Sequence, residues 1–232
     1  MDVKLLEKCT ICPHNCGINR LNNQIGRCKS KNIVKIALYS THNFEEPCIS
    51  GKKGSGTVFF SNCNMNCVFC QNYEISQQGK GREISIDELA SIFIKQQEKD
   101  VENINLVTPT SYVPQIIEAI KIARNNGLKL PIVYNTNGYE KVETLKMLDG
   151  FVDIYLPDFK YYNNEIAKKY GLTFLYRDFR IGFREGQAKA RELLLYMQKY
   201  CGCIFSEEDR YYNRIKKDKE DSLKASIDTK TI

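Results

Sequence analysis

The stretch that decides the fold reads SGTVFFSNCNMNCVFCQNYEIS and spans residues 55–76. A β-rich run at 57–60 leads directly into Cys63, Cys67 and Cys70, which have the spacing C-x3-C-x2-C. A four-iron cluster takes four ligands, so three thiolates from one short loop leave one iron open. Zinc usually takes a closed set of four ligands, and no fourth ligand stands beside these three. We therefore predict a [4Fe–4S] cluster on this triad, in preference to a zinc site or three unlinked thiols.

Outward from the triad, strand-like and helical patterns alternate. This alternation predicts βα units built on a parallel sheet, with crossovers of one hand. Functional loops then follow the carboxyl ends of the strands, which is where the polar clusters of this sequence lie. Ser85 and Glu88 have the spacing of a capping box, and Gly127 is placed to end a helix. The predicted strands are 33–39, 57–60, 104–107, 130–134 and 151–156, and the predicted helices are 87–98, 113–126, 139–148, 163–170 and 187–200.

The cysteine content and the charge distribution limit the classes of protein to which this sequence can belong. Ten cysteines occur in 232 residues, and eight of them lie within the first 70. The N-terminus lacks the apolar core of a signal peptide and no stretch could span a membrane, so we expect a cytoplasmic protein without a membrane partner. Clustered cysteines in the reducing cytosol indicate metal or redox chemistry. Residues 163–232 are basic, with 15 Lys or Arg against 11 Asp or Glu, but the mixed signs favour a solvated surface over nucleic-acid binding.

The triad and three later segments resemble radical S-adenosylmethionine (SAM) enzymes. Within them the sequence is most similar to the pyruvate formate-lyase activating enzyme-like group, in an uncharacterised subgroup with extra N-terminal cysteines. The resemblance covers about residues 9–170 and implies an α/β fold, a partial TIM-like (β/α) barrel with about four recognisable βα units of the expected six. Its later segments are NINLVTPTSYVPQI (103–116), LPIVYNTNGYEKVETLKMLDG (130–150) and FVDIYLPDFKYY (151–162).

The resemblance also implies where the cofactors bind. The open iron would chelate the amino and carboxylate groups of SAM, and turns after the next three strands would surround that cofactor. Most members carry a Gly-Gly-Glu-type turn where this chain has Thr108–Ser111, and Ser111 stands where we expect histidine. Read singly, these turns are also common turn sequences. The cofactor-binding residues so predicted are Thr108, Pro109, Thr110, Asn135, Asn137, Asp158 and Lys160; no separate catalytic residue is indicated.

A second group of thiols precedes the core. Cys9, Cys12, Cys16 and Cys28 have the spacing C-x2-C-x3-C-x11-C in a turn-rich segment. Four thiols suit a closed zinc site and equally a second Fe–S cluster, and the sequence leaves both open, along with free thiols. Cys48 follows a His/Glu-Glu-Pro segment that resembles one of the subgroup and could line the active site, although a lone buried cysteine is the commoner outcome.

These patterns predict three regions and one leading function. Residues 1–54 form a Cys-rich metal-binding lead-in, 55–170 a radical SAM core and 171–232 a divergent helical and polar segment. We expect reductive cleavage of SAM to a 5′-deoxyadenosyl radical that abstracts hydrogen from a substrate, with a glycyl radical enzyme as one candidate substrate and flavodoxin or ferredoxin as electron donor. Because no strand pattern continues after Gly171, we also expect that the chain binds SAM weakly or not at all, despite its intact cluster loop. The alternatives are a non-catalytic iron–sulfur or zinc-binding remnant and, more distantly, a zinc-dependent nucleic-acid-binding module.

Overall fold

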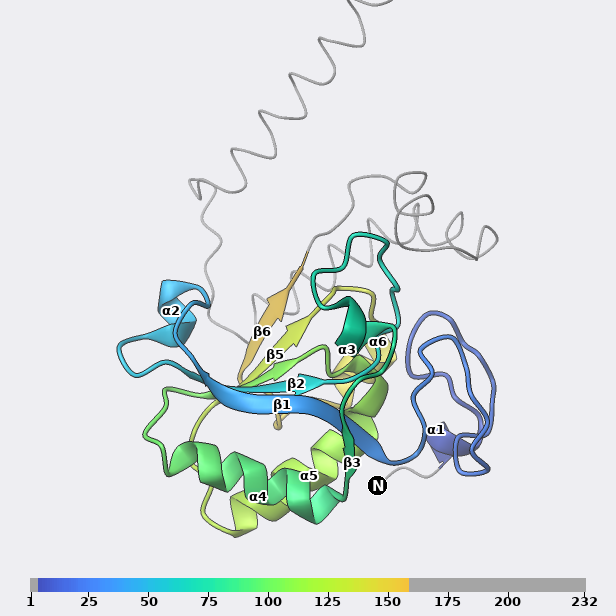
Figure 1. Cartoon of the computed structure of the whole chain (residues 1–232). Coiled ribbons are helices and arrows are strands. Elements are labelled where there is room, and N and C mark those ends of the chain that lie inside the picture. The colour runs from blue at the N-terminus through green and yellow to red at the C-terminus, as the bar shows by residue number, and fades with distance from the viewer. Residues whose placement is uncertain (1–3, 159–232) are drawn as a thin grey trace, which may run out of the picture. The chain divides into compact units, whose positions relative to one another are not determined.

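The structure is a computed structural model that describes residues 4–158. These residues build a six-stranded mixed sheet in the order β3-β1-β2-β4-β5-β6 (Figure 1). Strands β2, β4, β5 and β6 run parallel, whereas β1 is antiparallel to both of its neighbours. The strands are β1 (Val34–His42), β2 (Ser55–Phe60), β3 (Arg82–Ile84), β4 (Ile104–Val107), β5 (Ile132–Thr136) and β6 (Ile154–Pro157).

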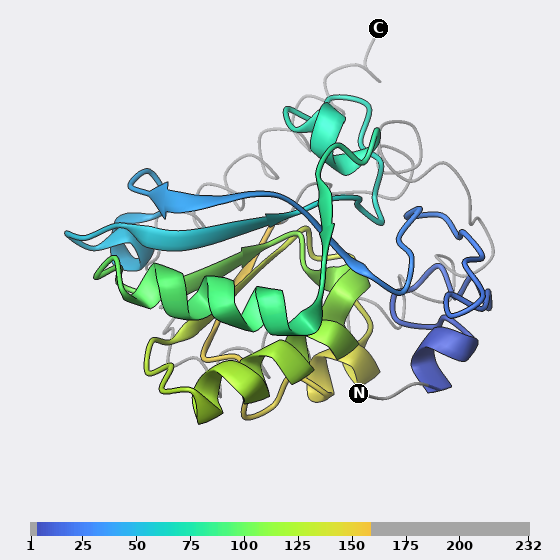
Figure 2. The same cartoon turned by 60° about the horizontal axis from the view of Figure 1, so that its bottom comes forward.

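Two long helices cover one face of this sheet, and Figures 1 and 2 show them side by side. Leu89 and Phe93 of α4 and Ile116 of α5 belong to one buried apolar cluster with Ile104 and Leu106 of β4. Burial of such side chains is the main stabilising contribution to a layered α/β fold. The helices are α1 (Lys4–Glu7), α2 (Pro47–Ser50), α3 (Tyr73–Ser76), α4 (Ile86–Gln97), α5 (Val113–Asn125) and α6 (Val142–Lys146), with a 3-10 turn η1 (Thr110–Tyr112).

The parallel sheet predicted from the sequence is confirmed for four strands. The predicted N-cap is present as well, since the Ser85 side chain accepts a 3.0 Å hydrogen bond from the Glu88 amide. The Glu88 carboxylate pairs with Arg82, so the reciprocal bond of a full capping box is not made by that oxygen. The antiparallel strand β3 was not predicted, because three residues with two exposed side chains carry no periodic signal. Closure of the sheet into a partial barrel stays a prediction, and so do the helices at 163–170 and 187–200, which lie outside the described residues.

One predicted helix is shorter than expected. The sequence predicts a helix over 139–148, but α6 begins at Val142 and ends at Lys146. The Tyr139 amide donates to the Asn137 side chain at 2.9 Å, and Lys141 is still extended with φ −101° and ψ 140°. An asparagine side chain that captures a nearby amide competes with helix formation, so the turn after β5 extends into the predicted helix.

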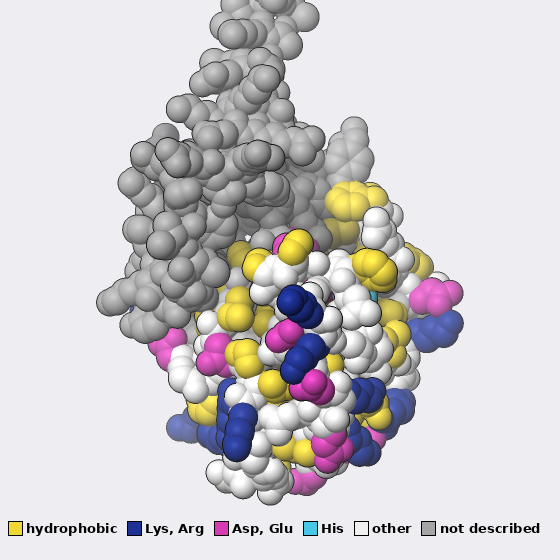
Figure 3. Space-filling model, turned by 90° about the vertical axis from the view of Figure 1, so that its left-hand side faces the viewer, with side chains coloured by type: hydrophobic (Ala, Val, Ile, Leu, Met, Phe, Trp, Pro, Cys, Tyr) yellow, Lys and Arg dark blue, Asp and Glu magenta, His cyan; other side chains and the backbone are white. Residues whose placement is uncertain are grey.

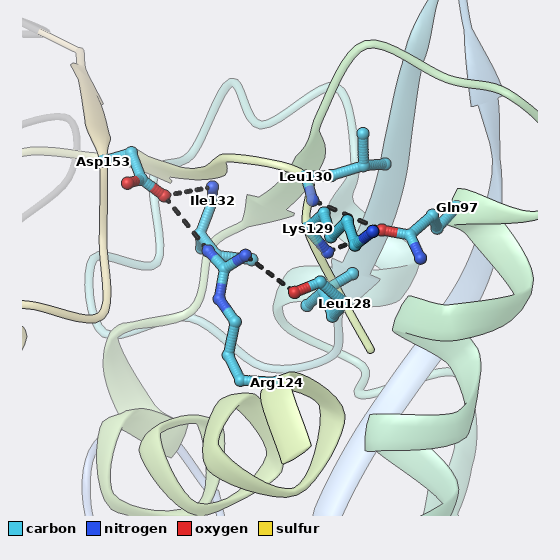
Figure 4. Close-up of polar contacts among 7 residues, drawn as sticks. All are labelled: Gln97, Arg124, Leu128, Lys129, Leu130, Ile132 and Asp153. Atoms are coloured by element: carbon cyan, nitrogen blue, oxygen red, sulfur yellow. Dashed lines mark hydrogen bonds and ion pairs between the residues drawn. The ribbon is translucent and has the colours of Figure 1, made fainter. Parts of the chain in front are cut away.

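Side-chain hydrogen bonds, including some from α4 and α5, hold the amino end of the parallel strand β5 in place (Figure 4). The Gln97 carbonyl oxygen accepts from the backbone amide of Lys129 at 2.7 Å. Asp153 accepts from the Ile132 amide at 2.8 Å and pairs with Arg124 at 3.4 Å. These contacts fix the entry to β5, so this edge of the sheet has a structural role.

The basic stretch for which the sequence predicts a solvated surface, residues 163–232, lies outside the described residues. On the face seen in Figure 3, acidic and basic side chains are interspersed among apolar ones. A surface of mixed sign produces no strong field of either charge. Within residues 4–158, no helix has the length and apolar character needed to cross a membrane.

Candidate metal and cofactor site

The triad lies in the loop that follows β2, at the carboxyl end of that strand. Cys67 is buried, while Cys63 and Cys70 are partly buried, and all three belong to a small apolar cluster with Met65 and Tyr139. Asn62 and Asn66 adopt left-handed backbone conformations with φ of 72° and 57°. Asparagine tolerates this conformation better than most residues, so the asparagines just before Cys63 and just before Cys67 let the loop curl tightly.

Hydrogen-bond donors point at the triad sulfurs. The Asn137 side-chain amide lies 3.3 Å from Cys63 Sγ, and the Met65 backbone amide lies 3.4 Å from the same atom. Burial raises the pKa of Cys63, and these donors lower it by stabilising the thiolate. Cys70 Sγ lies 3.2 Å from Ser76 Oγ. Such bonds to cluster sulfurs are one of the means by which a protein tunes an Fe–S centre.

The triad fits a [4Fe–4S] cluster by ligand type, by number and by its origin in a single loop. In the described part of the chain, no three Cys, His, Asp or Glu side chains converge closely enough to hold a metal ion. Cluster binding therefore requires rotation of the cysteine side chains toward one another.

The predicted cofactor turns meet at the same edge of the sheet. Thr108 follows β4 and donates its backbone amide to Asn135 at 2.9 Å, and Asp158 after β6 donates its own to Thr136 at 2.8 Å. A Cβ on Gly138 would come within 2.6 Å of the Asp158 carbonyl, so only glycine allows this approach. Pro109 immediately precedes η1. Lys160 lies outside the described residues.

Asn137 is the predicted residue that contacts the triad directly. Besides Cys63 Sγ, its side-chain amide donates to Asn64 at 2.7 Å, and Asn64 in turn donates to the Tyr139 carbonyl at 2.8 Å. Asn135 points elsewhere and makes a long 3.4 Å contact to Glu45, a residue of the segment before Cys48. The turn after β5 thus binds the cysteine loop on one side and that segment on the other.

Glu140 is a site residue that the sequence reasoning missed. Its Oε1 atom accepts hydrogen bonds from the side chains of Thr110, Thr136 and Tyr134, which come from the ends of β4 and β5. Its Oε2 atom is buried and has no hydrogen-bond partner among residues 4–158. Burial raises the pKa of Glu140 to about 7, and the three hydroxyl donors oppose that rise. No signal in the sequence separated this glutamate from the exposed face of a predicted helix.

The N-terminal set is also brought together. Cys9, Cys12, Cys16 and Cys28 line one cavity, together with Arg20. Burial raises the pKa of Cys12 to about 12; the amide of His14 opposes this rise, and the other three thiols add to it. Whether these cysteines bind a metal stays a prediction.

Arg20 was missed by the sequence reasoning, although it is one of the largest fully buried side chains among the described residues. It donates to the Ser111 carbonyl at 2.7 Å and to the Lys31 carbonyl, and it lies over the Tyr112 ring. An arginine in a polar segment is normally exposed, so nothing in the local sequence distinguishes Arg20 from a surface residue.

Cys48 differs from the commoner outcome expected for a lone cysteine. It is exposed, at the start of the short helix α2, and not buried. The residues around it in 43–48 are largely exposed, so the local sequence offers no apolar environment that would enclose the thiol. Cys201 and Cys203 lie outside the described residues.

Comparison with known proteins identifies the family. The sequence profile of the radical SAM superfamily matches residues 57–184, which include the triad, the parallel strands and the turns after them. The chain belongs to the radical SAM superfamily. The match continues beyond residue 170, where the resemblance seen in the sequence ends. Membership implies a [4Fe–4S] cluster and SAM, and it suggests an enzyme with redox chemistry.

Individual relatives align with parts of this chain. An uncharacterised protein of Methanocaldococcus jannaschii is 35% identical over 177 residues, which cover 71% of this chain and 49% of that protein. A second uncharacterised protein of the same organism is 26% identical over 159 residues, 61% of this chain and 46% of the relative. The chain thus spans about half the length of these two relatives. The epoxyqueuosine reductase QueH of Thermotoga maritima is 40% identical over 57 residues, 24% of this chain and 30% of that protein.

Proposed function

We propose that this chain is a radical SAM enzyme in which Cys63, Cys67 and Cys70 hold the [4Fe–4S] cluster. The observation that carries the proposal is the contact between the triad loop and the turn after β5, where Asn137 donates to Cys63 Sγ at 3.3 Å. This contact supports a single site, formed by the triad loop and the turn after β5 together, at the carboxyl ends of the parallel strands. When bound, the cluster supplies the electron that cleaves a carbon–sulfur bond of SAM and releases a 5′-deoxyadenosyl radical.

The protein's own residues provide the surroundings for that chemistry. Asn137 and the Met65 amide stabilise the Cys63 thiolate through their hydrogen bonds. The turns at 108–111 and 135–138 supply backbone and side-chain polar groups at the adjacent strand ends, suited to the amino and carboxylate groups of the cofactor. Glu140 holds these two turns together, since its carboxylate accepts from Thr110 and Thr136.

Within this class, we propose hydrogen abstraction from a glycine of a protein partner, as in the pyruvate formate-lyase activating enzyme-like group. The support is the Asn135–Gly138 turn and the Asp158-x-Lys160 motif, which resemble those of the activating enzymes. A flavodoxin or ferredoxin is the proposed electron donor. The match to QueH covers less than a third of either protein and carries no proposal of epoxyqueuosine reduction.

Anaerobic reconstitution tests the proposal. The full chain is loaded with iron and sulfide, reduced, mixed with SAM and assayed for 5′-deoxyadenosine. We expect the wild type and the control Cys48→Ala to form 5′-deoxyadenosine, and the variant Cys63→Ala/Cys67→Ala/Cys70→Ala to lose both the product and the cluster absorbance. A wild type that holds a cluster but forms no product would favour the non-catalytic remnant. Equal iron content in the triple variant would contradict the assignment of the ligands.

A further inference from the structure

We propose that Cys9, Cys12, Cys16 and Cys28 bind a single structural zinc ion, and that this ion fixes the segment that supports the triad loop. The proposal of a zinc site rests on the geometry of residues 9–28 alone. Its effect on the triad rests on the proposed function of that loop.

All four cysteines line one small cavity. Its volume is about 10 Å³, which corresponds to the space for roughly one water molecule. No three metal-ligating side chains of residues 4–158 yet converge closely enough to hold an ion, so the thiols must turn toward the cavity. A single ion then needs less expansion of this small space than a four-iron cube would. Four cysteine thiolates are also the complete tetrahedral ligand set of a structural zinc site.

Backbone hydrogen bonds group the first three cysteines. The Cys9 amide donates to the Ile18 carbonyl and the Gly17 amide donates back to the Cys9 carbonyl, both at 2.9 Å. A further bond from the Asn15 amide to the Cys12 carbonyl, at 3.0 Å, closes a tight turn. Asn15 and Gly17 flank Cys16 with φ of 44° and 65°, conformations that asparagine and glycine adopt most easily. The backbone therefore holds these three thiols on one side of the cavity.

The fourth cysteine is brought in by a close approach at Gly26. A Cβ at this position would lie 3.0 Å from Cys16 Sγ and 3.1 Å from Cys16 Cβ. These contacts are tighter than ordinary van der Waals separations, so any other residue here would push against the Cys16 side chain, and glycine suits this close packing best. The Lys29 amide then donates to the Gly26 carbonyl at 3.1 Å and turns the chain at Cys28.

The charge of the surroundings suits four thiolates. Zinc bound by four cysteinates carries a net double negative charge, which is costly to bury without compensation. Arg20 and Arg27 both line the cavity, and Arg20 is fully buried. Two arginines so near the thiols bring positive charge into the surroundings of the site, which offsets part of that negative charge.

Two residues of this segment reach the proposed cluster site. His14, between Cys12 and Cys16, lies with Nε2 2.7 Å from the carbonyl oxygen of Asn64, the residue after Cys63. A carbonyl only accepts, so Nε2 carries the proton. Arg20, between Cys16 and Cys28, donates to the Ser111 carbonyl at 2.7 Å. Metal binding that orders 9–28 therefore also orders the supports of the triad loop and of the turn after β4, and Figures 1 and 2 show the segment beside that end of the sheet.

Metal analysis of the full chain tests the zinc site. Four forms are purified anaerobically after expression with zinc and iron: wild type, Cys63→Ala/Cys67→Ala/Cys70→Ala, Cys12→Ser/Cys28→Ser and the exposed control Cys48→Ser. We expect about one zinc per chain in all but the Cys12→Ser/Cys28→Ser variant, which should lose it. In case that variant does not fold, cobalt is titrated into the triad variant, where a tetrahedral thiolate spectrum is expected. Absence of both zinc and this spectrum from the triad variant overturns the site, and stoichiometric iron in place of zinc overturns the choice of metal.

The coupling to the triad has a separate readout. His14→Ala keeps all four ligands, so it should retain zinc yet hold fewer reconstituted clusters, measured by the intensity of the electron paramagnetic resonance signal per chain. An unchanged signal in both His14→Ala and Cys12→Ser/Cys28→Ser overturns the coupling. A wild type that binds zinc but no cluster would instead show the proposed function to be wrong while the zinc site stands.

Discussion

The two cysteine groups of this chain are built in opposite ways. The triad loop depends on groups from elsewhere in the sequence, such as Asn137 after β5, and it leaves Val68 and Phe69 with 65% and 57% of their surfaces exposed. The N-terminal set is organised by hydrogen bonds within 9–29 and encloses a small cavity. An open site with three thiols leaves a coordination position for a second molecule, whereas a closed site with four does not. The difference separates a site suited to chemistry from one suited to structure.

The largest change in stability is expected when the contact between the N-terminal segment and the core is removed. Arg20→Met keeps the length of the side chain but leaves the carbonyls of Ser111 and Lys31 without their buried donor. We expect a loss of about 3–5 kcal/mol in the free energy of unfolding, as for other broken buried charged contacts. Chemical denaturation measures it.

The control for this variant is Arg82→Met, which breaks an ion pair with Glu88 in which both side chains are about half exposed. The loss there should be at most about 1 kcal/mol. Equal effects of the two substitutions would mean that Arg20 does not join the N-terminal segment to the core.

The pH dependence of stability tests the triad side of the comparison, because Glu140 lies at the strand ends next to the triad loop. Its pKa in the folded chain is raised from 4.5 to about 7, so the folded state binds a proton more tightly than the unfolded state. The stabilisation that this group contributes is therefore fully present below about pH 4.5, decreases as the pH rises toward 7 and is lost above it. This group should cost on the order of 3 kcal/mol by pH 8.

Glu140→Gln should remove this pH dependence, because the amide stays neutral and its oxygen still accepts from Thr110 and Thr136. The measurement is the unfolding temperature at several values between pH 5 and 8, with the exposed Glu143→Gln as control. The interpretation of Glu140 is wrong if the two variants show the same slope.

A smaller effect is expected at the triad itself. Asn137→Ala removes the donor to Cys63 Sγ and the hydrogen bond to Asn64. We expect a loss of about 1–2 kcal/mol in stability and a more negative reduction potential of the reconstituted cluster, since a donor to sulfur favours the more negatively charged reduced form. Redox titration followed by electron paramagnetic resonance gives the potential. The matched control Asn135→Ala loses only a 3.4 Å contact to Glu45 and should leave the potential unchanged.

The sequence predicted the parallel part of the fold well, because β2, β4, β5 and β6 carry strong apolar runs. It also placed the polar turns at one edge, since the carboxyl ends of parallel strands must meet there. The roles of Glu140 and Arg20 could not be predicted, because each depends on burial by residues distant in the chain. Local patterns report which face of an element is apolar, and they do not report which polar side chain that fold will enclose.

The smallest effect concerns Thr108, in the turn where most members of the family carry a Gly-Gly-Glu-type sequence. Thr108 has φ of 59°, a left-handed conformation that is strained for a β-branched residue. Thr108→Gly should relieve about 1–3 kcal/mol of strain in the folded state. The greater backbone freedom of glycine also stabilises the unfolded state, by about 0.5–1 kcal/mol. We expect a net gain of about 1 kcal/mol, measured by chemical denaturation. The same change at Thr41, an exposed residue of β1, should destabilise by about 0.5–1 kcal/mol. If Thr108→Gly also destabilises, the side chain makes contacts that outweigh its strain. A gain in stability together with less 5′-deoxyadenosine would indicate that the strained turn is retained for the cofactor.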